Sequence, residues 1–242
     1  MKQQVILFAI AICTLSSGCS VPDKPALRIA VSTTPGSAVL YLAQEAGLFR
    51  QYGVNVQIVE LSSGCECSMA LADGQVDAVA IPYGELLAMR EGSASMGILM
   101  LLAASNKQMP EYDHVDHNLE WFQGDIEVLT GRRSDLMLRR RDWQQVLLAY
   151  EHARLLLTGE REKHAAIIAQ RESRSPEEFI SDLQRWSLFG VADQDSLLGD
   201  NGPFSAMKAH WQGRKFLTAA ATSKLFQDRE SETVTAHGSG AK

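Results

Sequence analysis

The sequence has few of the residues that mark several large classes of protein. Its 242 residues include only four cysteines, seven prolines and 7% aromatic residues, and acidic residues outnumber basic ones by 29 to 23. The net charge of −6, without a basic patch that contains aromatic side chains, argues against a nucleic-acid partner. No internal repeat is present, and beyond the N-terminal segment no apolar run is long enough to cross a membrane.

The sequence also lacks a clear pairing of a nucleophile with a base. We therefore expect a binding protein rather than an enzyme, and we expect no cofactor. Hydrophobic residues make up 45% of the chain, which is enough for an ordinary globular core.

Residues 27–83 carry the strongest pattern in the chain. Apolar runs at 27–31, 54–61 and 77–81 predict strands, and helical spacing between them predicts two helices, the first starting at Ser37 and the second after Gly64. Strands that alternate with helices indicate a parallel sheet with right-handed crossovers, so we predict an α/β fold.

In open α/β sheets, ligands bind beyond the carboxyl ends of the strands. Two of the predicted loops also lead into helix N-termini, where free N–H groups favour an anionic or strongly polar group. We therefore predict a ligand site made by the residues of three loops: Ser32, Thr33, Thr34, Ser37, Ser62, Ser63, Gly64 and Tyr83.

Several segments of this stretch occur in the order typical of one known family. The run PGSAVLYLAQEAGLFRQYGVNVQIVELSSG, followed by ALADGQVDAVAI, resembles the first lobe of periplasmic solute-binding proteins of ABC importers. The resemblance is to the nitrate, sulfonate, taurine and thiamine-precursor type (SsuA- or ThiY-like). It implies a type II periplasmic-binding-protein lobe with a parallel-rich sheet, followed by C-terminal helices.

The resemblance also implies a second lobe of roughly a hundred residues, and we expect this chain to lack most of it. Only residues 106–125, a polar segment without strand–helix pattern, stand in its place. GRRSDLMLRRRDW (131–143) resembles the return strand and the start of the next helix, with Asp135–Leu138 as strand. A further helix is predicted to start at the capping signal Ser175-Pro176-Glu177-Glu178 and to carry Phe179 to Leu188 inward.

The N-terminus predicts export. Residues 1–19 have the layout of a secretory signal that ends in a lipoprotein-like box at Cys19, so we expect lipidation there and a location in the cell envelope on the periplasmic side. The predicted domain bounds follow from this: signal 1–19, tether 20–26, first lobe 27–105, shortened crossover 106–125, return strand and helices 126–227, and a disordered tail 228–242.

Three features leave alternatives open. Cys65 and Cys67 are either small residues in a helix turn, a strained disulfide, or a redox or metal pair. His114 and His117 form a weak candidate metal pair within an acidic connector. The arginines around residues 132–141 form either a solvated face or a docking surface for an acidic partner or anionic headgroups.

The leading hypothesis is therefore an exported, membrane-tethered protein that binds a small sulfonate, nitrate or thiamine-precursor molecule for an ABC permease. The alternative is a single-lobe adaptor or ligand sensor that docks on a membrane protein and no longer transports.

Overall fold

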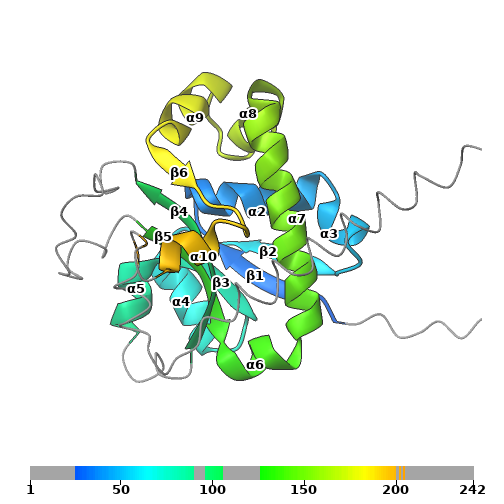
Figure 1. Ribbon diagram of the computed structural model, residues 1–242, viewed down its shortest axis with the longest axis vertical. Helices are drawn as coiled ribbons and strands as arrows, with labels where there is room; N and C mark the ends of the chain where they lie inside the picture. The colour runs from blue at the N-terminus through cyan, green and yellow to red at the C-terminus, as the bar shows by residue number, and fades with distance from the viewer. Residues whose placement is uncertain (1–24, 90–95, 106–125, 200–201, 203, 205–242) are drawn as a thin grey trace, which may run out of the picture.

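A computed structural model describes residues 25–89, 96–105, 126–199, 202 and 204. These residues form a single six-stranded sheet with helices on both faces (Figure 1). The strands are β1 (Leu27–Val31), β2 (Val56–Glu60), β3 (Ala78–Pro82), β4 (Met96–Ser105), β5 (Ile126–Arg132) and β6 (Trp186–Leu188).

The helices follow the strands in the alternation that the sequence predicts for residues 27–83. They are α2 (Pro35–Glu45), α3 (Leu48–Gln51), α4 (Gly64–Ala72), α5 (Tyr83–Ala88), α6 (Arg133–Leu138), α7 (Arg140–Gly159), α8 (Arg161–Arg171), α9 (Pro176–Leu183) and α10 (Gln194–Leu198).

The strand order is β2-β1-β3-β5-β4-β6. β1 pairs in parallel with β2 and β3, whereas β5 lies antiparallel between β3 and β4, and β6 pairs antiparallel with β4. The carboxyl ends of β1 to β4 and the first residues of β5 therefore meet at one edge of the sheet. The last residues of β4 lie beside the first residues of β5, because Ala104 pairs with Ile126. The chain therefore leaves the sheet and returns to it at adjacent points.

The sheet has a hydrophobic core on each face. One core packs α2, α3, α7, α8 and α9 against the sheet, with Trp143 and Tyr150 of α7 almost fully buried. The other core packs α4, α5 and α10, together with Phe189 and Phe204. Because both faces are covered, β4 is buried along its whole length.

Two expectations for the C-terminal half are wrong. Asp135 to Leu138 belong to helix α6, and the strand that returns to the sheet is β5, immediately before it. Helix α9 ends at Leu183, and Trp186–Leu188 forms edge strand β6 rather than continuing the helix. The start of α9 is as expected, because Ser175 and Glu178 form a reciprocal capping box.

Gln194 fastens α10 to the middle of β4. Its side chain is fully buried, accepts the Leu101 N–H at 2.9 Å and donates to the Leu101 carbonyl at 3.0 Å. It also donates to the Gly190 carbonyl at 3.0 Å. The amide thus satisfies main-chain groups of β4 in the way that a neighbouring strand would.

Candidate functional site

The eight residues predicted to bind a ligand lie at one edge of the sheet. They follow β1, β2 and β3, whose carboxyl ends meet there because the three strands are parallel. Helices α2 and α4 begin at this edge, immediately after the first and second strands. The structure thus brings the three predicted loops together at the edge where the fold places its ligands.

A glutamate that the sequence reasoning missed occupies the start of α2. Glu127 of β5 pairs in register with Pro82, so its side chain reaches this edge from the antiparallel strand. Its carboxylate accepts the Gly36 N–H at 2.9 Å and the Ser37 hydroxyl at 2.6 Å, and it also accepts the Thr34 hydroxyl. Three donors that a bound anion would use are therefore engaged by the chain itself.

Glu127 is buried without a charged partner for its hydrogen bonds. It is 2% exposed, and burial raises the pKa of its carboxyl group, while the hydrogen bonds from Ser37, Thr34 and Gly36 act in the opposite direction. The positive end of the α2 dipole is the remaining favourable influence on a negative charge at this position. A Cβ atom added to Gly36 would lie 2.5 Å from Glu127 Oε2, so glycine is what lets the carboxyl group approach the helix.

The start of α4 also has a carboxyl group beside it. Glu85 of α5 lies against Gly64, where an added Cβ atom would be 2.3 Å from its Oε2. Burial raises the pKa of Glu85. The Ser63 hydroxyl caps α4 by accepting the Glu66 N–H at 3.2 Å, and Glu66 in turn accepts the Ser62 N–H at 3.1 Å.

The predicted ligand residues differ in how accessible they are. Thr33 and Ser62 are exposed at the edge. Ser32 is 7% exposed, and Ser37 and Tyr83 are fully buried, Tyr83 within the core that α4 and α5 share with the sheet. The accessible part of the edge therefore consists mainly of the tips of the first two loops.

Both cysteines of α4 are free thiols. Cys65 is exposed, whereas Cys67 is buried. Burial, followed by the charge of Glu85, raises the pKa of the Cys67 thiol to about 12. The described ranges contain no group of three or more His, Cys, Asp or Glu side chains arranged to hold a metal ion.

Several predictions concern residues that the structure does not describe. Cys19 and the signal, the crossover 106–125 with His114 and His117, and the tail 228–242 lie outside the described ranges. The absence of a second lobe thus stays a prediction. Among the described helices, none has the length and apolar character that crossing a membrane requires.

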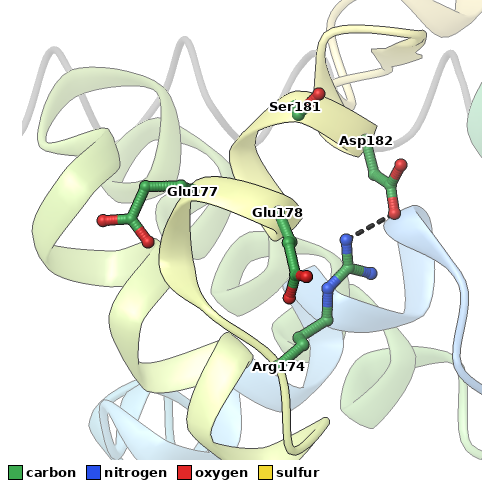
Figure 2. A pocket seen from close by; sticks show the side chains of 5 residues that line it. All are labelled: Arg174, Glu177, Glu178, Ser181 and Asp182. Atoms are coloured by element: carbon green, nitrogen blue, oxygen red, sulfur yellow. Dashed lines mark hydrogen bonds and ion pairs between the residues drawn. The ribbon is translucent and has the colours of Figure 1, made fainter.

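A hollow of about 580 Å³ lies on helix α9. It is lined by Arg174, Glu177, Glu178, Ser181 and Asp182, which Figure 2 shows along the helix and in the turn that precedes it. Arg174 pairs with Asp182, and Glu178 accepts the Ser175 N–H at 2.9 Å. Two of its carboxylates are thus engaged in local structure, and we assign no ligand to this hollow.

Comparisons with known proteins bear on the fold. Residues 20–111 match the model of the NMT1-like family. None of the curated proteins matches the sequence. Similar solved structures include a zinc-bound ligand-binding component of an ABC-type import system from Staphylococcus aureus, with 10% identity, a TM-score of 0.56, and coverage of 83% of this chain and 98% of that one.

Two further structures are similar at the same level. A Candida albicans protein described as having the generic periplasmic-binding-protein fold shares 9% identity, with a TM-score of 0.54 over 77% of this chain and 90% of that one. The aliphatic sulphonate binding protein SsuA from Escherichia coli shares 13% identity, with a TM-score of 0.50 over 83% and 91%. The chain resembles the NMT1-like family over residues 20–111, and its fold is that of the periplasmic binding proteins.

Proposed function

We propose that this chain is an exported solute-binding protein that holds a small polar molecule at the carboxyl ends of β1, β2 and β3 for an ABC permease. The observation that carries this proposal is the convergence of three loops and two helix N-termini at one sheet edge. The fold, shared with ligand-binding components of import systems, supports it. We further propose that Cys19 anchors the mature chain to a membrane through lipid.

The two glutamates at this edge bear on the class of solute. Glu127 fills the start of α2, and Glu85 lies against the start of α4. A sulfonate or nitrate placed there would have to displace Glu127 from the donors at the start of α2. When the two carboxyl groups are ionised they would also repel an anion, most strongly where water is excluded. Among the candidate classes, we therefore favour a neutral or basic thiamine-precursor pyrimidine over the small anions, with Thr33 and Ser62 at the accessible loop tips.

A second candidate function is a single-lobe adaptor or sensor that does not transport. The position of Glu127 favours it, because its carboxyl group accepts the hydrogen bonds at the start of α2 that a bound ligand would otherwise accept. In that case the chain would dock on a membrane protein without needing a solute. Neither candidate involves catalysis.

Thermal unfolding of the mature chain against thiamine-precursor pyrimidines, alkanesulfonates, nitrate and polyamines separates the two candidates. A ligand at a hundred times its Kd stabilises the folded state by about 2.7 kcal/mol, which raises the unfolding midpoint measurably. We expect a pyrimidine to raise the midpoint of the wild type and to lose this effect in Ser62→Trp. Ser181→Trp on α9, also exposed, is the matched control and should respond as the wild type does.

If no compound moves a cooperative transition, the solute-binding proposal is wrong and the adaptor remains. If a sulfonate or nitrate shifts the midpoint while the pyrimidines do not, the inference drawn from the two glutamates is wrong.

A further inference from the structure

The corner between α6 and α7, residues 132–142, presents apolar side chains to solvent. Leu138 is 86% exposed and Met137 is 49% exposed, although they follow the buried Leu136 directly in the chain. Figure 1 shows α6 at one end of the long helix α7, so this corner projects from the body of the protein. Two adjacent exposed apolar residues at a projecting corner favour contact with an apolar phase.

The same corner is strongly basic within an acidic protein. It contains five arginines against two aspartates, whereas the whole chain has a net charge of −6. Both aspartates are paired inside the corner, Asp135 with Arg132 at 2.7 Å and Asp142 with Arg139 at 3.0 Å. Among the described residues, three of the arginines form no ion pair: Arg133, Arg140 and Arg141.

The N-terminal end of the described chain is fixed to this corner. Arg139 donates from Nη2 to the Pro25 carbonyl at 2.9 Å. A hollow of about 400 Å³ opens beside this contact, lined by Pro25, Leu138, Arg139, Arg140, Arg141 and Asp142. Because a chain spans at most about 3.4 Å per residue, a lipid on Cys19 would lie within roughly 20 Å of Pro25.

We propose that the α6–α7 corner is a membrane-docking surface for anionic phospholipid headgroups. The unpaired arginines bind headgroup phosphates, which match guanidinium in geometry and charge. Leu138 and Met137 enter the boundary between headgroups and acyl chains. A lipid on Cys19 would hold the chain near the bilayer, and a basic patch beside it would add electrostatic attraction to anionic lipids and decide which face meets the membrane.

This inference rests on the proposed export and tethering but not on solute binding. Docking through the corner places the membrane at one end of α7. The opposite end of this 20-residue helix, about 30 Å long, then lies up to that distance further from the bilayer. The orientation of the whole lobe on the membrane is thereby fixed by the corner rather than by the tether alone.

Vesicle co-sedimentation tests the surface without the lipid anchor. The mature chain carrying Cys19→Ser is mixed with vesicles of phosphatidylglycerol and phosphatidylcholine, or of phosphatidylcholine alone, at low and high salt. We expect the partition coefficient to be at least tenfold higher on the anionic vesicles and to fall as salt rises. Each arginine near an anionic surface contributes about a fivefold factor, so Arg140→Glu with Arg141→Glu should lower binding by at least about 25-fold.

The matched control reverses the same number of charges elsewhere. Arg50 and Arg161 are exposed outside the corner, so Arg50→Glu with Arg161→Glu gives the same net charge and should bind far better than the corner variant. Equal loss in the two variants would show a general charge effect and overturn the proposal.

A fluorescent label tests the apolar contact. An environment-sensitive dye on Leu138→Cys, in a mature chain with Cys19→Ser and Cys65→Ser, should shift its emission to the blue on anionic vesicles. The same dye on Leu155→Cys, which is 54% exposed further along α7, should not shift. A shift at neither position, or no binding by the wild type, would overturn the proposal and leave the corner to an acidic protein partner or to a second copy of the chain. The thermal response to a solute should be unchanged in the corner variants, so failure of one proposal does not imply failure of the other.

Discussion

Replacing Glu127 with glutamine tests how the buried carboxyl group at the start of α2 contributes to stability. Burial raises the pKa of Glu127 above that of a carboxyl group in the unfolded chain. The folded protein thus holds the proton more tightly than the unfolded chain does. The stability contributed by this group is fully present below the unfolded pKa and is lost as pH rises through the folded pKa.

Glutamine has no proton to release in this range, so the difference between the two proteins isolates the titration of Glu127. As pH rises above the ordinary carboxyl pKa, the free energy of unfolding of the wild type should fall relative to Glu127→Gln. The slope is at most about 1.4 kcal/mol per pH unit until the raised pKa is passed. The amide keeps the shape of the side chain, and its oxygen can accept the Gly36 N–H while the neighbouring hydroxyl groups reorient.

Urea unfolding of both proteins from pH 4 to pH 8 measures this difference directly. Glu127→Ala is the companion variant, and because it leaves the donors of Thr34, Gly36 and Ser37 without this acceptor we expect it to be about 3–5 kcal/mol less stable than Glu127→Gln at every pH. A wild type that gains stability over Glu127→Gln as pH rises would refute the reasoning. It would show that the helix dipole and the three donors outweigh burial and hold the carboxyl group ionised.

Three further predictions concern other parts of the fold. Gln194→Ala should lower the free energy of unfolding by about 2–4 kcal/mol in urea, because buried main-chain groups of β4 lose their partner. Gly36→Ala should cost about 1–3 kcal/mol in the same assay, because the added methyl group would meet both Glu127 and Leu102, and Glu127→Ala should relieve the part of this cost that comes from Glu127. A thiol reagent at pH 8 should modify Cys65 rapidly and Cys67 only after unfolding, because Cys67 is buried and its pKa is about 12.

The first lobe could be predicted from the sequence because its pattern is local. Residues 27–83 alternate short apolar runs with helical spacing, and each of the expected strands and principal helices is present. The capping signal at Ser175 was equally reliable, since Ser175 and Glu178 lie three residues apart and need no distant partner to form their box. The convergence of the loops followed from the parallel arrangement of the strands.

The errors arise where distant pairing decides the outcome. The apolar residues of Asp135–Leu138 suggest a strand. However, β5 already occupies the position between β3 and β4, and the segment that follows it forms helix α6 instead. Trp186 and Leu188 fit a helical stripe, yet their strand forms because β4 offers an unpaired edge.

Glu127 was missed for the same reason. A single acidic residue within the apolar run 126–130 does not reveal which groups its side chain will contact. The strand pairing that sets Glu127 opposite Pro82 brings its carboxyl group to the start of α2, some ninety residues earlier in the sequence. The available signal was the acid itself, because an unpaired charge is rare in a buried strand.

Because Ala104 and Ile126 are adjacent in the sheet, the connection between β4 and β5 is a site where the fold can accept an insertion. The pairing of β4 with β5 holds the two ends of the connecting segment side by side, whatever the length of that segment. The entropy of closing a loop grows only with the logarithm of its length, so 20 residues in place of about a hundred changes the closure cost by only about 1.4 kcal/mol. The lobe can therefore lose or gain a whole domain at this point while its own sheet stays intact, and a reporter domain grafted between residues 105 and 126 should leave the host folded.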